Sequence, residues 1–263
     1  MKSIFSARHK VLIGVVHLQP LPGSPRWRGD IESVVKFAVN DARAYERGGA
    51  HSLFIENFGD VPFTKGCVAP ETIAAMTAAG RAIRQAVKLP IGFNVLRNDA
   101  RAALALCAAC GGAFIRVNVH TGAMLTDQGL IEGNAYDTLR YRQRVCPTAQ
   151  IFADVHVKHA VPLGNWTIQD AARDTVERGL ADALIVSGAS TGLATDLADV
   201  ERVRRIAPGT KILLGSGVTS ANVRDFLPLA DGFIVGTSLK VGGTVSNPVD
   251  PRRVAALARA LGK

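Results

Sequence analysis

Two stretches near the end of the chain are the most informative: Lys211-Ile212-Leu213-Leu214-Gly215-Ser216-Gly217-Val218 and, shortly after it, Asp231-Gly232-Phe233-Ile234-Val235-Gly236-Thr237-Ser238. Each stretch is a short apolar run that ends in glycine and small hydroxyl residues. Continuous apolar runs of this length are typical of parallel strands that are covered on both faces. We therefore expect two buried strands near the end of the chain, at Lys211–Gly215 and Gly232–Gly236.

The same alternation of apolar runs and longer helical segments extends toward the start of the chain. Six further strands are expected at Val11–Leu18, Ser52–Phe58, Ile91–Leu96, Phe114–Val119, Ile151–Val157 and Ala183–Ser187. Helices are expected between and after them, at Ile31–Arg47, Glu71–Val87, Ala100–Cys110, Ile168–Arg178, Leu197–Ile206 and Pro251–Leu261. About eight βα units without a break in composition predict an α/β fold, a single (β/α)₈ TIM barrel over residues 1–263. A doubly wound open sheet is the alternative.

The glycine-rich ends of the last two strands predict a phosphate-binding site. Glycine lets the backbone approach an anion, and N–H groups at the start of a helix favour negative charge. Many barrels bind phosphate at the seventh and eighth strands. The predicted phosphate-binding residues are Gly215, Ser216, Gly217, Gly236, Thr237 and Ser238, with Lys240 adding charge. Plain tight turns are the alternative reading of both stretches.

Polar residues gather at the carboxyl ends of the other strands, where barrels carry their active sites. Because strand side chains alternate, Arg116 and Asn118 share one face, and so do Asp154 and His156, with Lys158 continuing that face. We expect Glu56, Asp154 and His156 to be catalytic through proton transfer. The expected substrate-binding residues are His17, Asn94, Arg116, Asn118, Lys158 and Ser187.

For any single member of this set, structural hydrogen bonding is an equal alternative, but burying so many polar groups together favours a functional site. Lys158 is either a Schiff-base lysine or a solvated surface residue. No cofactor is predicted. A divalent metal on His17 and the carboxylates stays open, although the first strand lacks a His-x-His pair.

Composition limits the other function classes. The net charge is +9, but the arginines are scattered along helices without interleaved aromatics, so a nucleic-acid partner is not expected. No apolar run reaches the roughly 18 residues of a membrane span, and the first residues do not resemble a secretory signal. We expect a cytoplasmic protein without integral membrane insertion. A homo-oligomer stays open, and the four cysteines are expected to be packing thiols.

Two segments are long for connections that follow barrel strands, at Gln19–Arg26 and Thr121–Tyr136. Loops at this end of a barrel build the active site. The segment Thr121–Tyr136 contains three glycines and the polar residues Asp127, Gln128 and Glu132. We expect it to be a lid over the mouth of the barrel, with a polar surface excursion as the alternative.

The chain closely resembles the BtpA family, also called the BtpA/SgcQ family. The matching stretches are Gly14–Pro25, Glu56–Phe63, Phe114–Asn118, Thr126–Gly133 and Ala153–His159, which together span much of the chain. The resemblance implies a phosphate-binding barrel. The family takes its name from a cyanobacterial factor needed for photosystem I accumulation, and some of its members lie among sugar-utilisation genes. It brings no agreed reaction, so no catalytic residue is transferred from it.

Three functions follow from these observations. The first is an enzyme that acts on a phosphorylated small molecule, either a sugar phosphate or a nucleoside- or nucleotide-like compound, as an isomerase, lyase or glycosidic hydrolase. The second is a non-catalytic assembly or biogenesis factor, which would not need a buried polar mouth. The third, a nucleic-acid binder, is supported by net charge alone.

Overall fold

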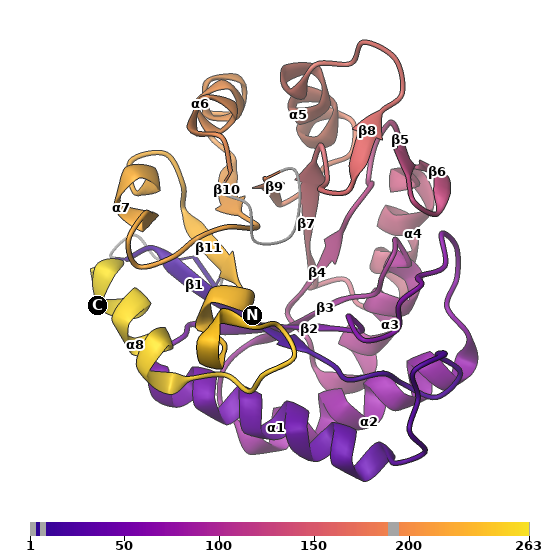
Figure 1. Ribbon diagram of the computed structural model, residues 1–263. Helices are drawn as coiled ribbons and strands as arrows, with labels where there is room; N and C mark the ends of the chain where they lie inside the picture. Colours follow the sequence, from indigo (N-terminus) through magenta and orange to yellow (C-terminus); the bar gives the residue numbers. More distant parts are fainter. Residues whose placement is uncertain (1–3, 6–8, 189–194, 263) are drawn as a thin grey trace.

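The computed structural model describes residues 4–5, 9–188 and 195–262, and its central feature is a closed barrel of eight parallel strands (Figure 1). The barrel strands are β1 (Val11–His17), β2 (Ser52–Glu56), β3 (Ile91–Asn94), β4 (Phe114–Val117), β7 (Gln150–Val155), β9 (Ala183–Val186), β10 (Lys211–Leu214) and β11 (Gly232–Val235). They neighbour one another in chain order, and β11 pairs with β1 to close the ring. The predicted TIM barrel is confirmed.

Helices surround this barrel and cover its outer surface (Figure 1). They are α1 (Ile31–Gly48), α2 (Pro70–Ala86), α3 (Ala100–Cys110), α4 (Ala135–Val145), α5 (Ile168–Glu177), α6 (Leu197–Ile206), α7 (Val223–Phe226) and α8 (Pro251–Ala260). Their starts follow from capping residues. The Asp30 side chain accepts a hydrogen bond from the Ser33 N–H at the start of α1, and Asp99 does the same for Ala102 at α3. None of the helices in the described residues is long and apolar enough to span a membrane.

The barrel interior is a packed core, because strand residues alternate between the inside and the helix-covered outside. On β1, Val11, Ile13 and Val15 belong to the interior cluster, whereas Leu12 and Val16 pack toward the helices. Three rings from β2, β4 and β7 fill the lower part of the barrel: Phe54, Phe114 and Phe152 lie with centroids 4.8 to 6.3 Å apart. This packing closes one end of the barrel and leaves the carboxyl end for polar groups.

The barrel strands end one or two residues earlier than the apolar patterns predicted, and the segment expected as an irregular lid is partly regular. It contains β5 (Ala123–Thr126) and β6 (Gly129–Glu132), which form an antiparallel hairpin. The short strand β8 (Ala160–Pro162) pairs with β5, so the hairpin belongs to a small three-stranded sheet. Whether this sheet moves over the mouth of the barrel stays a prediction.

Three of the four cysteines are buried packing groups, and the expectation is wrong for Cys67. Cys107, Cys110 and Cys146 are buried free thiols, and Cys67 is exposed. The Cys107 thiol donates to the Phe114 carbonyl oxygen over 3.3 Å, and burial raises its pKa well above the usual range.

Candidate functional site

The inward-facing positions at the carboxyl end of the barrel divide into two kinds. Six strands carry polar side chains there: His17, Glu56, Asn94, Arg116 with Asn118, Asp154 and Ser187. The neighbouring strands β10 and β11 instead end in Gly215 and Gly236. A Cβ atom at Gly215 would meet the Ser187 side chain at 2.5 Å, and one at Gly236 would meet the His17 ring at 2.6 Å. The two glycines therefore face the barrel interior and leave space beside the polar groups.

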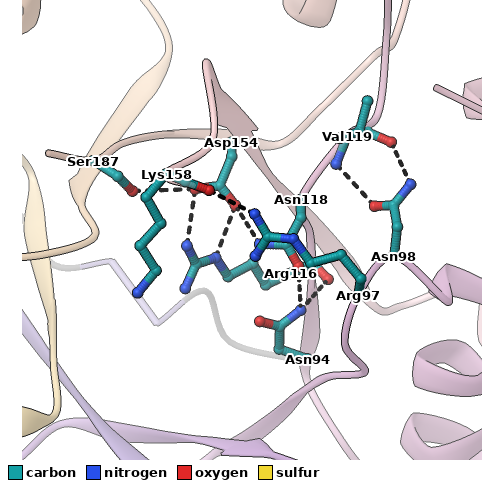
Figure 2. Close-up of polar contacts among 9 residues, drawn as sticks. All are labelled: Asn94, Arg97, Asn98, Arg116, Asn118, Val119, Asp154, Lys158 and Ser187. Atoms are coloured by element: carbon teal, nitrogen blue, oxygen red, sulfur yellow. Dashed lines mark hydrogen bonds and ion pairs between the residues drawn. The ribbon is translucent and has the colours of Figure 1, made fainter. Parts of the chain in front are cut away.

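An ion pair between Arg116 and Asp154 organises the polar side (Figure 2). The Arg116 Nε and Nη2 atoms donate to the two carboxylate oxygens of Asp154 over 2.8 and 2.9 Å. Asn118 donates to the same carboxylate over 3.1 Å and Ser187 over 3.2 Å. Burial acts to lower the pKa of Arg116, but the Asp154 carboxylate outweighs it and the net pKa is raised. Asp154 therefore accepts four hydrogen bonds and holds Arg116 in one orientation.

Asn94 extends this network to the third strand. Its side-chain nitrogen donates to the Asn118 oxygen over 3.0 Å and to the Arg116 carbonyl over 3.3 Å. The Asn94 side-chain oxygen has no hydrogen-bond partner among the described residues. A buried acceptor of this kind is costly unless a ligand supplies the missing donor.

A cavity of about 400 Å³ opens where the two glycines lie. All six predicted phosphate-binding residues border it, from Gly215–Gly217 and from Gly236–Ser238. The Ser216 hydroxyl accepts from the Gly188 N–H over 2.9 Å, and the Ser238 hydroxyl donates to the Val218 carbonyl over 2.7 Å. The serine hydroxyls thus fix the loops, whereas Gly217, with a φ of 66°, needs the conformational freedom of glycine.

The charged neighbours of this cavity differ from those expected. Lys240 is fully buried and forms an ion pair with Asp41 of α1, whose other oxygen accepts from the Val249 N–H over 2.8 Å. The expectation that Lys240 adds charge to the phosphate site is therefore wrong. The chain turns through a 3₁₀ helix at Thr237–Leu239, which directs Lys240 toward α1. Arg253 borders the cavity instead, and its Nη1 donates to the Ser238 carbonyl over 3.2 Å.

The sequence analysis does not single out Arg253 from the arginines scattered along helices. The signal that could have identified it is its position in the first turn of α8, the helix that follows the second glycine-rich strand after two short 3₁₀ turns. Residues at the start of that helix lie close to the phosphate-binding loops of a barrel. Its guanidinium is partly exposed and lies at the rim.

A second cavity of about 410 Å³ adjoins the first. Phe58, Phe63 and Leu96 give it apolar walls, and Arg97 and Asp127 give it charged groups. Both cavities share three lining residues, Glu56, Arg116 and Lys158. A ligand that occupied both cavities would place its middle atoms against these three side chains.

Two titratable groups at this junction, Lys158 and His17, have lowered pKa values. Burial lowers the pKa of Lys158, and the like charge of Arg116 lowers it further. His17 has its pKa lowered well below 6.5 by burial and by nearby cations, of which Lys240 is the largest contributor. The His17 ring is therefore neutral, and its Nε2 lies 3.9 Å from the nearest Glu56 oxygen. Among the described residues, the Glu56 carboxylate accepts no hydrogen bond.

His156 lies beyond the end of its strand, so strand alternation does not decide where its side chain points. Strand β7 ends at Val155, and His156 has a φ of 52°. Together with Asp154 it borders a narrow space of about 20 Å³ beside Trp166 and Thr175 rather than either larger cavity. Burial lowers its pKa. The structure therefore does not bring the three expected catalytic residues into one cavity.

The described residues contain no group of three His, Cys, Asp or Glu side chains arranged to hold a metal ion. Two members of the expected set, His17 and Glu56, are neighbours. Asp154 is occupied by its four donors, and His156 borders neither of the cavities that Glu56 borders. A metal on these residues is not proposed.

The fold and this site define a class: a TIM barrel with a polar pocket at the carboxyl ends of its strands and a glycine-lined cavity at the last two. The chain belongs to the BtpA family, whose model matches residues 8–263. Photosystem I biogenesis protein BtpA of Synechocystis is 47% identical over 253 residues, which cover 96% of this chain and 88% of that protein. The putative sgc region protein SgcQ of Escherichia coli is 35% identical, with 93% and 91% covered.

Solved structures with the same fold are more distant in sequence. A tryptophan synthase structure of Mycobacterium tuberculosis superposes with a TM-score of 0.64 at 18% identity, covering 97% of this chain and 93% of that one. N-(5'-phosphoribosyl)anthranilate isomerase of Pyrococcus furiosus gives a TM-score of 0.58 at 11% identity, with 96% and 98% covered. At these identities the likeness shows the fold alone.

Proposed function

We propose that this protein is an enzyme that acts on a phosphorylated small molecule, such as a sugar phosphate or a nucleoside-like phosphate. The phosphate binds in the cavity at the ends of β10 and β11, and the rest of the substrate extends into the second cavity. The observation that carries the proposal is the pair of inward-facing glycines, Gly215 and Gly236, on neighbouring strands. They expose backbone to a cavity that continues into the cluster of buried polar groups.

The charges around the glycine-lined cavity suit an anion. Arg253 at its rim supplies a positive group, and the backbone N–H groups of Gly217, Gly236 and Thr237 are the proposed donors. A dianionic phosphate would gain charge-assisted hydrogen bonds from each. The short helical turn after Gly236 is too brief to act as a helix dipole, so the proposal rests on the exposed backbone and on Arg253.

Glu56 is the proposed proton-transfer group. Its carboxylate is buried, borders both cavities and accepts no hydrogen bond from a described residue, so it can exchange a proton with a ligand. Asp154, which accepts four hydrogen bonds, is better suited to positioning Arg116 than to proton transfer. This arrangement fits isomerase or lyase chemistry, and glycosidic hydrolysis uses the same kind of group.

The name of one structural relative, N-(5'-phosphoribosyl)anthranilate isomerase, contains a phosphorylated sugar compound, which supports this class of substrate. The name of the Synechocystis relative supports a role in biogenesis, which an enzyme could also serve. A non-catalytic assembly factor would gain nothing from the buried Asn94 oxygen that lacks a partner among the described residues, because such an oxygen costs stability without a ligand. We therefore favour the enzyme over the non-catalytic assembly factor.

Calorimetric titration with inorganic phosphate, and with ribose 5-phosphate against ribose, tests the phosphate site. The wild type should bind the phosphorylated compounds and not ribose. Arg253→Ala should weaken binding by about tenfold, since a hydrogen bond to a charged group contributes about 1.5 kcal/mol at its lower end. Arg252→Ala is the matched control, because Arg252 is an exposed neighbour that borders neither cavity. Equal affinity of both variants, or no binding by the wild type, would overturn the proposal.

A further inference from the structure

The side chain of Lys158 lies where the two cavities meet. Lys158 comes three residues after the end of β7, and its carbonyl oxygen accepts a hydrogen bond from Arg97 Nη2 over 2.5 Å. This contact fixes the backbone, and the side chain extends back toward the Arg116 guanidinium (Figure 2). It borders both the glycine-lined cavity and the second cavity.

The Lys158 amine has no fixed partner in the part of the chain that the structure describes. No hydrogen bond or ion pair joins its Nζ to Glu56, Asp154 or any other described residue. The neighbouring carboxylate of Asp154 is already saturated by Arg116, Asn118 and Ser187. A lysine that served as a structural cation would be expected to take a carboxylate partner, as Lys240 does with Asp41.

The surroundings favour the neutral amine, which is the nucleophilic form. Lys158 is largely removed from water, and the guanidinium of Arg116 is held beside it by Asp154. Burial and a neighbouring cation are the two devices by which proteins activate a lysine. Glu56 and Asp154 oppose this effect, and Arg97 adds to it, but the net effect is a lowered pKa.

We propose that Lys158 forms an imine with a carbonyl carbon of the substrate, so that the substrate is a phosphorylated aldehyde or ketone. This inference rests on the proposed function for the position of the phosphate. The phosphate would lie at Gly215 and Gly236, and the carbonyl carbon would lie at the junction beside Lys158 and Glu56. The second cavity would take the remainder of the carbon chain.

The step balances without a further reactant. The amine nitrogen forms a bond to the carbonyl carbon, and the carbonyl oxygen takes up a proton. The nitrogen then loses its two protons overall, and the oxygen leaves as water that carries both, relayed through Glu56. When the imine nitrogen is protonated, it draws electrons from an adjacent C–H or C–C bond, which is the chemistry of a lyase or an isomerase.

The first test uses the smallest carbonyl compound and the wild-type protein. Reductive methylation with formaldehyde and cyanoborohydride is followed by peptide mass mapping at several pH values. Lys158 should be methylated faster than exposed Lys88 near neutral pH, by about tenfold for each unit by which its pKa is lowered. A rate for Lys158 no greater than for Lys88 would overturn the inference.

The second test uses glyceraldehyde 3-phosphate and dihydroxyacetone phosphate with borohydride, alongside glyceraldehyde and dihydroxyacetone. A trapped adduct should add the mass of the phosphorylated probe less one oxygen atom, should map to Lys158, and should be lost in Lys158→Met but not in Lys88→Met. Folding of both variants is checked by circular dichroism.

The two proposals fail in different ways. Phosphate binding without preferential trapping at Lys158 by either phosphorylated probe would overturn the imine and leave the phosphate site. Trapping at Lys158 that is equally efficient with the probes that lack phosphate would support the imine and contradict the phosphate site.

Discussion

Replacing Gly236 by alanine tests how the glycine-lined cavity is built. The backbone at Gly236 has a φ of −121°, so alanine would not have to adopt a positive φ there. Its Cβ would lie 2.6 Å from Cε1 and 3.2 Å from Nε2 of His17, and 3.4 Å from the Val15 Cβ. Carbon atoms normally approach to about 3.5 to 4.0 Å, so the His17 ring must move by about 1 Å.

The His17 ring has little freedom to move. It is buried at the mouth of the barrel, and its centroid lies 4.6 Å from that of Phe58. Overpacking of this kind typically costs about 1 to 3 kcal/mol. We therefore expect Gly236→Ala to lower the free energy of unfolding by about that amount, and to weaken phosphate binding because the displaced ring moves within the cavity wall.

A double-mutant cycle separates this clash from other effects. In the His17→Ala background only the Val15 contact remains, so Gly236→Ala should cost less than about 1 kcal/mol there. Gly209→Ala is the control, since a Cβ at Gly209 meets nothing within 4 Å and the change should stay within about 0.5 kcal/mol. Urea unfolding gives the free energies and calorimetry the phosphate affinity. An equal cost of Gly236→Ala in both backgrounds would refute this reasoning.

Three further perturbations have expected outcomes. Lys240→Met should lower the free energy of unfolding in urea by about 3 to 5 kcal/mol, because it leaves Asp41 buried without its cation. The double variant Lys240→Met/Asp41→Leu should recover part of this loss. Folded Lys240→Met should bind phosphate as the wild type does; weaker binding would return Lys240 to the phosphate site. Because the pKa of His17 is lowered in the folded state, the free energy of unfolding should fall as pH drops below about 6.5, by up to about 1.4 kcal/mol per pH unit. His17→Phe removes this group, so its free energy of unfolding in urea should depend less steeply on pH. Asp154→Asn should destabilise by about 3 kcal/mol or more, whereas Glu56→Gln should change unfolding by less than about 1 kcal/mol; the reverse order would contradict the roles assigned to them.

Much of the barrel could be predicted because eight apolar runs require eight buried strands, and alternation fixes which residues face inward. The same rule placed Arg116 with Asn118 and put Glu56 at the mouth. It does not reach His156, because alternation applies only while the backbone stays extended, and the backbone there has a positive φ. It could not place Lys240 or Arg253, since their directions depend on a 3₁₀ turn and on the docking of α8.

The two buried carboxylates of the mouth differ in a way that composition and spacing do not reveal. Both are 6% exposed and both belong to strands of the same barrel. Asp154 accepts four hydrogen bonds, so protonating it would break an ion pair with Arg116 and leave a guanidinium buried without its partner. The Glu56 carboxylate accepts no hydrogen bond from a described residue, and the Nε2 of the neutral His17 ring lies 3.9 Å away, so gaining or losing a proton there breaks no hydrogen bond with a described residue. Environments of this kind give paired carboxylates different roles in one site. Under the proposed function we therefore expect Glu56 to be the carboxylate that transfers a proton, and Asp154 to be the one that keeps Arg116 beside Lys158.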